Sequence, residues 1–223
     1  MATHRKWFLR LGIGTAVFLE NLVADLRSVL AWSWLYSLFR SLVGGKQGLI
    51  ILLREHIKPH AHMRILDMGC GPAAILDVLP PVSYVGFDSN ADYIRSAEEK
   101  HGDRGKFLVR TISRDGFDDL RDFDIVLAIG LIHHLDDRKA LETVRIAKAA
   151  LRDGGRLILF DGCFVEEQSW LARYLLKKDR GCFVRNEDEY LHLVRQVFPN
   201  VQSTVRHDLL NISYTHIIIE CTA

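Results

Sequence analysis

The sequence lacks the residue patterns that mark several common classes of protein. Its four cysteines include no Cys-x-x-Cys pair, which argues against a zinc site and against a disulfide framework. It contains five prolines and has neither internal repeats nor low-complexity tracts. Its formal net charge is +1 at pH 7, so no strong overall charge draws it to nucleic acid or acidic lipid. These absences favour a globular cytoplasmic protein with reduced thiols and no nucleic-acid partner.

A long apolar run is also missing near the N-terminus. The apolar stretch there covers only residues 11–19, whereas a membrane-spanning helix needs about 20 residues. No clear cleavage site follows, although the lack of acids before Glu20 still allows a transit peptide. Apolar side chains at helical spacing through residues 18–42 predict amphipathic helices. These helices either pack on the core or make peripheral contact with a membrane, and the sequence leaves both open.

From about residue 60 onward, short apolar segments alternate with amphipathic ones. We therefore divide the chain into an N-terminal helical cap, residues 1–59, and an α/β domain, residues 60–223. Strand, helix and strand in alternation predict a doubly wound parallel sheet with helices on both faces. Strands are expected at residues 64–68, 83–87, 106–110, 123–130, 156–162, 200–208 and 214–221, and helices at 47–57, 73–79, 91–102, 136–155, 166–179 and 186–198. Ligands of such sheets bind beyond the carboxyl ends of the strands.

The turn after the first expected strand combines an acid with two glycines. Asp67 comes two residues before Gly69, and Gly71 follows, but the third glycine of a dinucleotide fingerprint is absent. A carboxylate here would repel a pyrophosphate, whereas it suits a ligand with an amino group and a positive charge. Asp88 ends the next strand, where an acid can accept both hydroxyls of a ribose. Alone, the glycines could mark an ordinary turn and Asp88 could cap a helix; their joint spacing favours a ligand site.

Four segments then carry a family resemblance: "ILDMGCGPA", "YVGFDSN", "FDIVLAIGLIHHLDD" and "LRDGGRLILFDG". In this order the chain resembles the class I methyltransferases that depend on S-adenosylmethionine (SAM), over roughly residues 62–165. The resemblance implies a Rossmann-like sheet of seven strands with an antiparallel last strand. It also implies SAM as cofactor and S-adenosylhomocysteine as product. The residues that it assigns to the cofactor are Asp67, Gly69, Cys70, Gly71, Asp88, Ser89, Gly130 and Leu131. Ala73 replaces a frequent third glycine, and no acid follows the strand at 106–110.

The loop after the fourth expected strand, "GLIHHLDD", indicates the kind of acceptor. It lacks the (N/D)-P-P-(Y/F) sequence of many enzymes that methylate amino groups, so a small molecule is the expected acceptor. A hydroxyl acceptor must lose its proton, and histidine is suited to accept it. His133 and His134 are the catalytic candidates; His133 is expected to face the acceptor, and His134 to order the loop. Asp136 is expected to cap the helix that follows.

The acceptor is expected to meet residues from two later loops. Cys163 and Phe164 follow the fifth strand, and Arg180 and Arg185 flank Gly181, where they could hold a carboxylate or phosphate. A solvated loop with surface ion pairs is the other interpretation of these arginines. Three functional alternatives stay open: a non-catalytic SAM-binding regulatory or partner subunit, a C- or N-methyltransferase for an apolar or membrane-associated substrate, and, less favoured, a nicotinamide-dependent dehydrogenase. The sequence identifies neither the acceptor nor the oligomeric state.

Overall fold

The computed structural model describes residues 45–112, 117, 119–178 and 181–223. The helices predicted over residues 18–42, and the membrane contact predicted for them, lie outside these ranges. The described residues belong to a unit that begins at Val43. Helix α3 (Gly45–Leu52) and the π-helical turn η1 (Leu53–Ile57) are therefore part of the same unit as the sheet, whereas the sequence suggested a boundary after residue 59.

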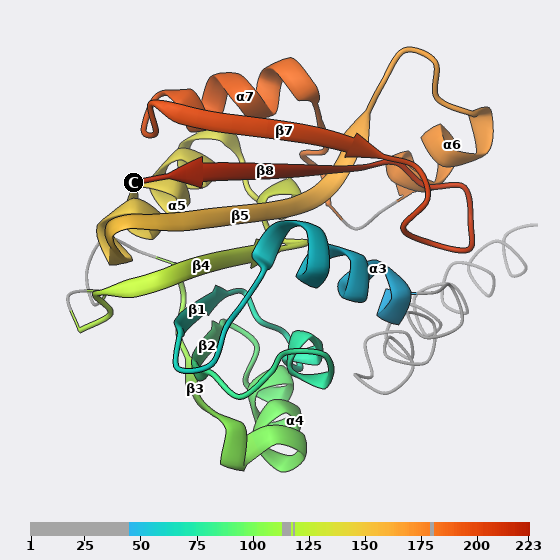
Figure 1. Ribbon diagram of the computed structural model, residues 1–223. Coiled ribbons are helices and arrows are strands. Elements are labelled where there is room, and N and C mark those ends of the chain that lie inside the picture. The colour runs from blue at the N-terminus through green and yellow to red at the C-terminus, as the bar shows by residue number, and fades with distance from the viewer. Residues whose placement is uncertain (1–44, 113–116, 118, 179–180) are drawn as a thin grey trace, which may run out of the picture. The chain divides into compact units, whose positions relative to one another are not determined.

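One sheet organises this unit, and its strands run in the order β3-β2-β1-β4-β5-β8-β7 (Figure 1). Neighbours from β3 to β5 are parallel, while β8 is antiparallel to both β5 and β7. The predicted Rossmann-like fold with an antiparallel last strand is thus confirmed. The strands are β1 (Arg64–Met68), β2 (Ser83–Asp88), β3 (Gly105–Val109), β4 (Phe123–Ile129), β5 (Leu151–Phe164), β7 (Asn200–Arg206) and β8 (His216–Thr222). A two-residue strand, β6 (Arg185–Asn186), pairs with the end of β5 and was not expected.

The central strands are apolar on both faces because helices cover both faces. In β4, Val126 belongs to one buried cluster and Ile125 to the other, as the alternation of a strand requires. Helices α5 (Asp137–Ala150) and α7 (Glu187–Arg195) contribute to the first cluster, and α3 and α4 (Ala91–His101) to the second. The two layers of helices leave the carboxyl ends of β1, β2, β4 and β5 at one edge, which is where the ligand was expected.

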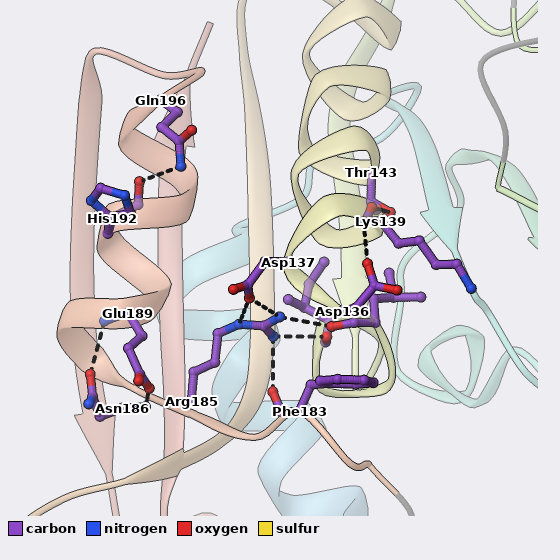
Figure 2. Close-up of polar contacts among 12 residues, drawn as sticks. Asp136, Asp137, Lys139, Thr143, Phe183, Arg185, Asn186, Glu189, His192 and Gln196 are labelled. Atoms are coloured by element: carbon purple, nitrogen blue, oxygen red, sulfur yellow. Dashed lines mark hydrogen bonds and ion pairs between the residues drawn. The ribbon is translucent and has the colours of Figure 1, made fainter.

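Side-chain caps fix the starts of three helices. Asn90 caps α4 by accepting hydrogen bonds from two main-chain N–H groups, and Asp136 caps α5 through Lys139 N, as predicted. Asn186 and Glu189 form a reciprocal capping box at the start of α7 (Figure 2). These caps set the points at which the loops of the sheet edge turn into helices.

The prediction of a helix over residues 73–79 is wrong. Only a short 3-10 turn, η2 (Ala74–Asp77), forms there. Ala73 adopts a left-handed conformation with φ of 53°, and Pro80 and Pro81 prevent continuation of the helix. Residues 151–155, predicted as the end of the helix over 136–155, instead begin β5. Further differences are smaller: α6 (Trp170–Lys178) begins later than predicted, and short 3-10 turns occur at η3 (Gly102–Arg104) and η4 (Ile132–His134). Among the described residues, no helix has the length and apolar character needed to cross a membrane.

Candidate functional site

The glycine turn after β1 is tied to the end of β2 by its main chain. Gly69 and Gly71 have φ of 69° and 54°, which residues with a Cβ rarely adopt. Cys70 N–H donates to the carbonyl of Phe87 at 2.9 Å, and Gly71 N–H donates to Asp88 Oδ2 at 3.0 Å. A Cβ placed on Gly71 would meet no atom within 4 Å, so the turn faces open space on that side. A ligand can therefore approach the main chain of Gly71 closely.

Asp88 organises this turn and does not cap α4. Its second oxygen, Oδ1, accepts a hydrogen bond from Asn90 N–H at 2.8 Å, while Asn90 itself caps the helix. The capping role considered for Asp88 is thus taken by its neighbour. The half-buried carboxylate of Asp88 lies beside Gly71, where the resemblance places the ribose, and the exposed Ser89 follows Asp88 in the sequence. Each carboxylate oxygen has room for a second hydrogen bond.

Asp67 is a buried carboxyl group with only one satisfied oxygen. Its exposed fraction is 3%, and the hydroxyl of Tyr84 donates to Oδ2 at 2.7 Å. Oδ1 is buried and has no hydrogen-bond partner among the described residues. Burial raises the pKa of Asp67 to about 7, against the opposing effect of the Tyr84 hydroxyl. A cationic ligand group at Oδ1 would supply the partner that the fold itself does not.

Cys70 lies between the two glycines with a half-buried side chain. Burial, followed by the negative charges of Asp67 and Asp88, raises the pKa of the Cys70 thiol. The thiol therefore stays protonated at neutral pH and is a poor nucleophile. Its position suits a main-chain contact with the cofactor better than a chemical role.

The loop after β4 packs directly on the glycine turn. A Cβ on Gly69 would lie 2.8 Å from Leu131 Cδ1, so the absence of a side chain at Gly69 permits this contact. Gly130 has φ of 64°, and its N–H donates to the carbonyl of Phe160 at 2.7 Å. Gly130 and Leu131 thus connect the predicted cofactor turn to the loop that contains His133 and His134.

His133 is buried and paired with Asp161. The Nδ1 atom of His133 contacts Asp161 Oδ1, and Asp161 Oδ2 accepts a hydrogen bond from Ile132 N–H at 3.0 Å. The exposed fractions of His133 and Asp161 are 8% and 2%. A carboxylate that accepts from Nδ1–H leaves the lone pair of the imidazole on Nε2. This pair has the geometry of a base and the acid that orients it.

Asp161 falls within the strand expected at residues 156–162, and the sequence analysis gave it no role. The signal was present: Asp67, Asp88 and Asp161 each follow an apolar run within a strand. In the pairing of β4 with β5, Ile129 lies opposite Phe160, so Asp161 reaches the turn that holds His133. That register cannot be derived from either segment alone.

His134 differs from its neighbour in burial. It is exposed, and its ring centroid lies 4.1 Å from that of His133. Its N–H donates to the carbonyl of Leu131 at 3.1 Å within the short η4 turn. The main chain of His134 thus belongs to the turn that orders this loop, while His133 forms the pair with the buried acid.

The four residues predicted to bind the acceptor differ in their surroundings. Phe164 is half-buried, with the guanidinium of Arg173 5.7 Å above its ring. Cys163 is a correction: it is fully buried in the core because β5 turns this side chain inward. Arg180 lies outside the described residues.

Arg185 is a second correction. Its side chain is buried and binds the protein itself, with hydrogen bonds to Asp137 and to main-chain carbonyls (Figure 2). No N–H group of its guanidinium remains for an acceptor, because each one already has a partner. Within the described residues, no three His, Cys, Asp or Glu side chains are grouped so as to hold a metal ion.

Comparison with known proteins identifies part of this chain as a methyltransferase domain. The sequence pattern that defines a methyltransferase domain matches residues 66–157, which hold both the glycine turn and the histidine loop. The chain contains a methyltransferase domain. This match and the fold confirm the predicted resemblance to the SAM-dependent class I methyltransferases. They also support the predictions that the protein is an enzyme and that SAM is its cofactor.

Solved structures show how widely this methyltransferase fold is shared. One is a phosphoethanolamine N-methyltransferase 2 of Haemonchus contortus, in complex with phosphomonomethylethanolamine and S-adenosylhomocysteine: TM-score 0.69, 14% identity, covering 88% of this chain and 58% of that one. A putative O-methyltransferase of Nostoc punctiforme gives 0.65 and 16%, covering 87% and 60%. The pyocyanin biosynthetic protein PhzM gives 0.64 and 16%, covering 80% and 55%.

The extent of these matches limits what they say about the methyltransferase domain. The chain spans 54–60% of the length of the first four solved structures. No curated protein matches the chain by sequence. The likenesses therefore establish the fold, while the residues of this chain must indicate the acceptor.

Proposed function

We propose that this chain transfers the methyl group of SAM to a hydroxyl oxygen of a small molecule, with His133 as general base. The observation that carries the proposal is the buried His133–Asp161 pair at the carboxyl ends of β4 and β5. His133 follows shortly after Leu131, which packs on the glycine turn. A base in this place is needed for a hydroxyl acceptor and has no evident purpose in a protein that only binds the cofactor.

The residues of the glycine turn fit SAM. The unpartnered Oδ1 of Asp67 is proposed to meet the ammonium group, and the left-handed Gly69 and Gly71 let the main chain approach the methionine end. Asp88, with Ser89 beside it, is proposed to accept the ribose hydroxyls while still holding the turn through Gly71 N–H. Cys70 and Gly130 complete the main-chain wall of the site.

Catalysis then depends on position and on one proton. SAM supplies a methyl group bound to a sulfonium, which makes that carbon electrophilic. With SAM bound, its methyl group would pass to the acceptor oxygen, the sulfur would keep the electron pair of the carbon–sulfur bond, and His133 Nε2 would take the hydroxyl proton. Asp161 keeps Nδ1–H directed away from the acceptor and stabilises the imidazolium that forms. Correct placement of the acceptor oxygen by the site would provide the remaining acceleration.

The surface near the end of β5 favours an apolar acceptor. Five large apolar side chains are more than one-third exposed among the described residues, and four of them lie on α6 or in the loop before β6: Trp170, Leu171, Tyr174 and Phe183. These exposed side chains offer apolar surface to an acceptor. A small apolar or aromatic molecule with a hydroxyl group is therefore the proposed substrate, and nucleic acid is not.

Two assays on the full chain test this function. Thermal shift is expected to show stabilisation by SAM and S-adenosylhomocysteine and none by NAD, because a ligand that binds the native state raises the melting temperature. Transfer of a labelled methyl group from SAM is then measured over a library of phenols, alcohols, amines and carbon acids. Labelled ether products are the expected result.

The outcomes separate the alternatives. Stabilisation by NAD without any effect of SAM would contradict the cofactor assignment. Binding of SAM with products only from amines or carbon acids would replace O-methylation by the N- or C-methylation that the sequence left open. Binding of SAM with no transfer to any acceptor, in a chain that retains His133, would favour the non-catalytic SAM-binding subunit.

A further inference from the structure

Arg185 donates hydrogen bonds from every N–H group of its guanidinium to the protein around η4. Its Nε and Nη2 donate to Asp137 Oδ1 at 3.0 and 2.7 Å. Nη1 donates to the carbonyls of Ile132 and Phe183 at 3.3 and 2.9 Å, and Nη2 donates to that of Leu135 at 2.8 Å. All five N–H groups of the guanidinium therefore have acceptors, in the planar arrangement that only arginine provides (Figure 2).

The carbonyls are the important acceptors in this set. The side chain of Asp137 is 89% exposed, so its ion pair with Arg185 is screened by water and contributes little. Arg185 itself is only 6% exposed, so its bonds to main-chain carbonyls are largely shielded from water. The carbonyls of Ile132 and Leu135 lie on either side of the two histidines in the sequence. Arg185 thus holds the turn η4 at both ends.

The loop that precedes Arg185 also touches His133 directly. Phe183 N–H donates to the carbonyl of His133 at 3.0 Å. Gly181 is buried against the ring, and an added Cβ would overlap Cδ2 of His133. The imidazole is therefore held by Asp161 at Nδ1 and bounded by Gly181 at a carbon edge. Rotation of the ring would require the loop to move, and Arg185 anchors that loop through Phe183.

We propose that Arg185 is the positioning residue for His133: by binding the main chain of η4 and its own loop, it keeps the imidazole in the orientation that Asp161 requires. This inference rests on the proposed function, in which His133 is the base. Arg185 acts through the main chain and touches neither the cofactor nor the acceptor. Lysine cannot replace it, because one ammonium group has three donors and no planar fork.

The test is proton NMR of the full chain with S-adenosylhomocysteine, combined with kinetics. The Nδ1–H proton shared with Asp161 should give a downfield resonance, assigned by its loss in His133→Gln. In Arg185→Lys this resonance should broaden or disappear. With the acceptor found by the screen, kcat should fall about 10²-fold, the order that an ångström-scale misplacement costs, while the affinity for SAM stays within a factor of about two. Arg185→Gln, which buries no unpaired charge, serves if the lysine variant does not fold.

Arg156→Lys is the matched control. Arg156 also binds two carbonyls, those of His56 and Ile57, and one carboxylate, that of Glu220, but it lies at the other end of β5. This variant should lose stability and keep both the resonance and kcat. The inference is overturned if the Arg185 variants retain them as Arg156→Lys does. A wild-type chain that binds no S-adenosylhomocysteine would refute the proposed function instead, and the resonance comparison would still decide the role of Arg185.

Discussion

Asp67 and Asp161 are two buried aspartates in neighbouring parts of one sheet edge, and they differ in how their charge is satisfied. Their exposed fractions are 3% and 2%. Asp161 has partners inside the chain for both oxygens, an imidazole and a main-chain N–H. Asp67 has the hydroxyl of Tyr84 on one oxygen and, among the described residues, nothing on the other. The charge of Asp161 is thus satisfied within the chain, whereas Asp67 Oδ1 leaves open the contact that we propose for the ammonium group of SAM.

The largest effect is expected from breaking the pair that is complete. Asp161→Asn should lower turnover by up to ~10²–10⁴-fold, the range of a general base, because the amide no longer fixes the tautomer of His133. His133→Ala should give a loss of similar size, and the double variant no more than either, since the two act as a unit. Steady-state kinetics at saturating SAM measures these losses. His134→Ala should retain most turnover, and a dead His134 variant with an active His133 variant would reverse the assignment.

The second prediction adds a third aspartate, Asp88, to the comparison. Asp88→Ala should weaken SAM binding by about 2–4 kcal/mol, because it removes two hydrogen bonds from ribose hydroxyls to a charged group. The variant also frees Gly71 N–H, so the turn itself loosens. Calorimetry on the folded variant gives the affinity. An unchanged dissociation constant would limit Asp88 to its observed role in the turn.

The third prediction concerns the pH at which Asp67 acts. Its pKa of about 7 lies above that of the unfolded chain, so the folded protein holds this proton longer. The stability of the ligand-free protein should therefore fall as pH rises from about 4 to about 7. The affinity for S-adenosylhomocysteine should move the other way and rise ~10-fold from pH 6 to pH 7.5, since its ammonium group needs the ionised acid. Calorimetry across this range tests it, and Asp67→Asn should remove the slope.

The smallest effect is expected at Tyr84. Tyr84→Phe removes the hydrogen bond to Asp67 Oδ2 and should weaken ligand binding at pH 7.5 by about 1 kcal/mol, or roughly fivefold. The pH midpoint of binding should move upward, because the hydroxyl favours the ionised acid. Tyr190→Phe is a control with another buried tyrosine, whose hydroxyl donates to the carbonyl of Gly162. Equal behaviour of the two variants would show that Tyr84 only supports the fold.

Local patterns in the sequence predicted most of the fold. β1, β2 and β4 are apolar runs of the right length, and Asn90 and Gly102 delimit α4 at nearly the predicted positions. The helix over 73–79 failed because the left-handed Ala73 is imposed by the turn that precedes it. The two residues of β6 are too few to show any periodicity.

The site was predicted less completely because its contacts are long-range. The acid of the glycine turn is recognisable from spacing along the chain. The partnership of His133 with Asp161 depends on the register of β4 and β5. The positive charge of Arg185 suggested that it contacts a ligand. Only the structure shows that Arg185 is buried and that its N–H groups already donate to the protein. Whether Cys163 faces the core or the site similarly depends on the direction of its side chain from β5.

The position of β8 also matters during synthesis of the chain. It follows the other described strands in sequence, yet it lies between β5 and β7 inside the sheet. Until residues 216–222 emerge from the ribosome, the backbone of β5 is an open edge that can pair with another chain. A variant without residues 216–222 should therefore expose this edge of β5 permanently and aggregate more readily than the full chain.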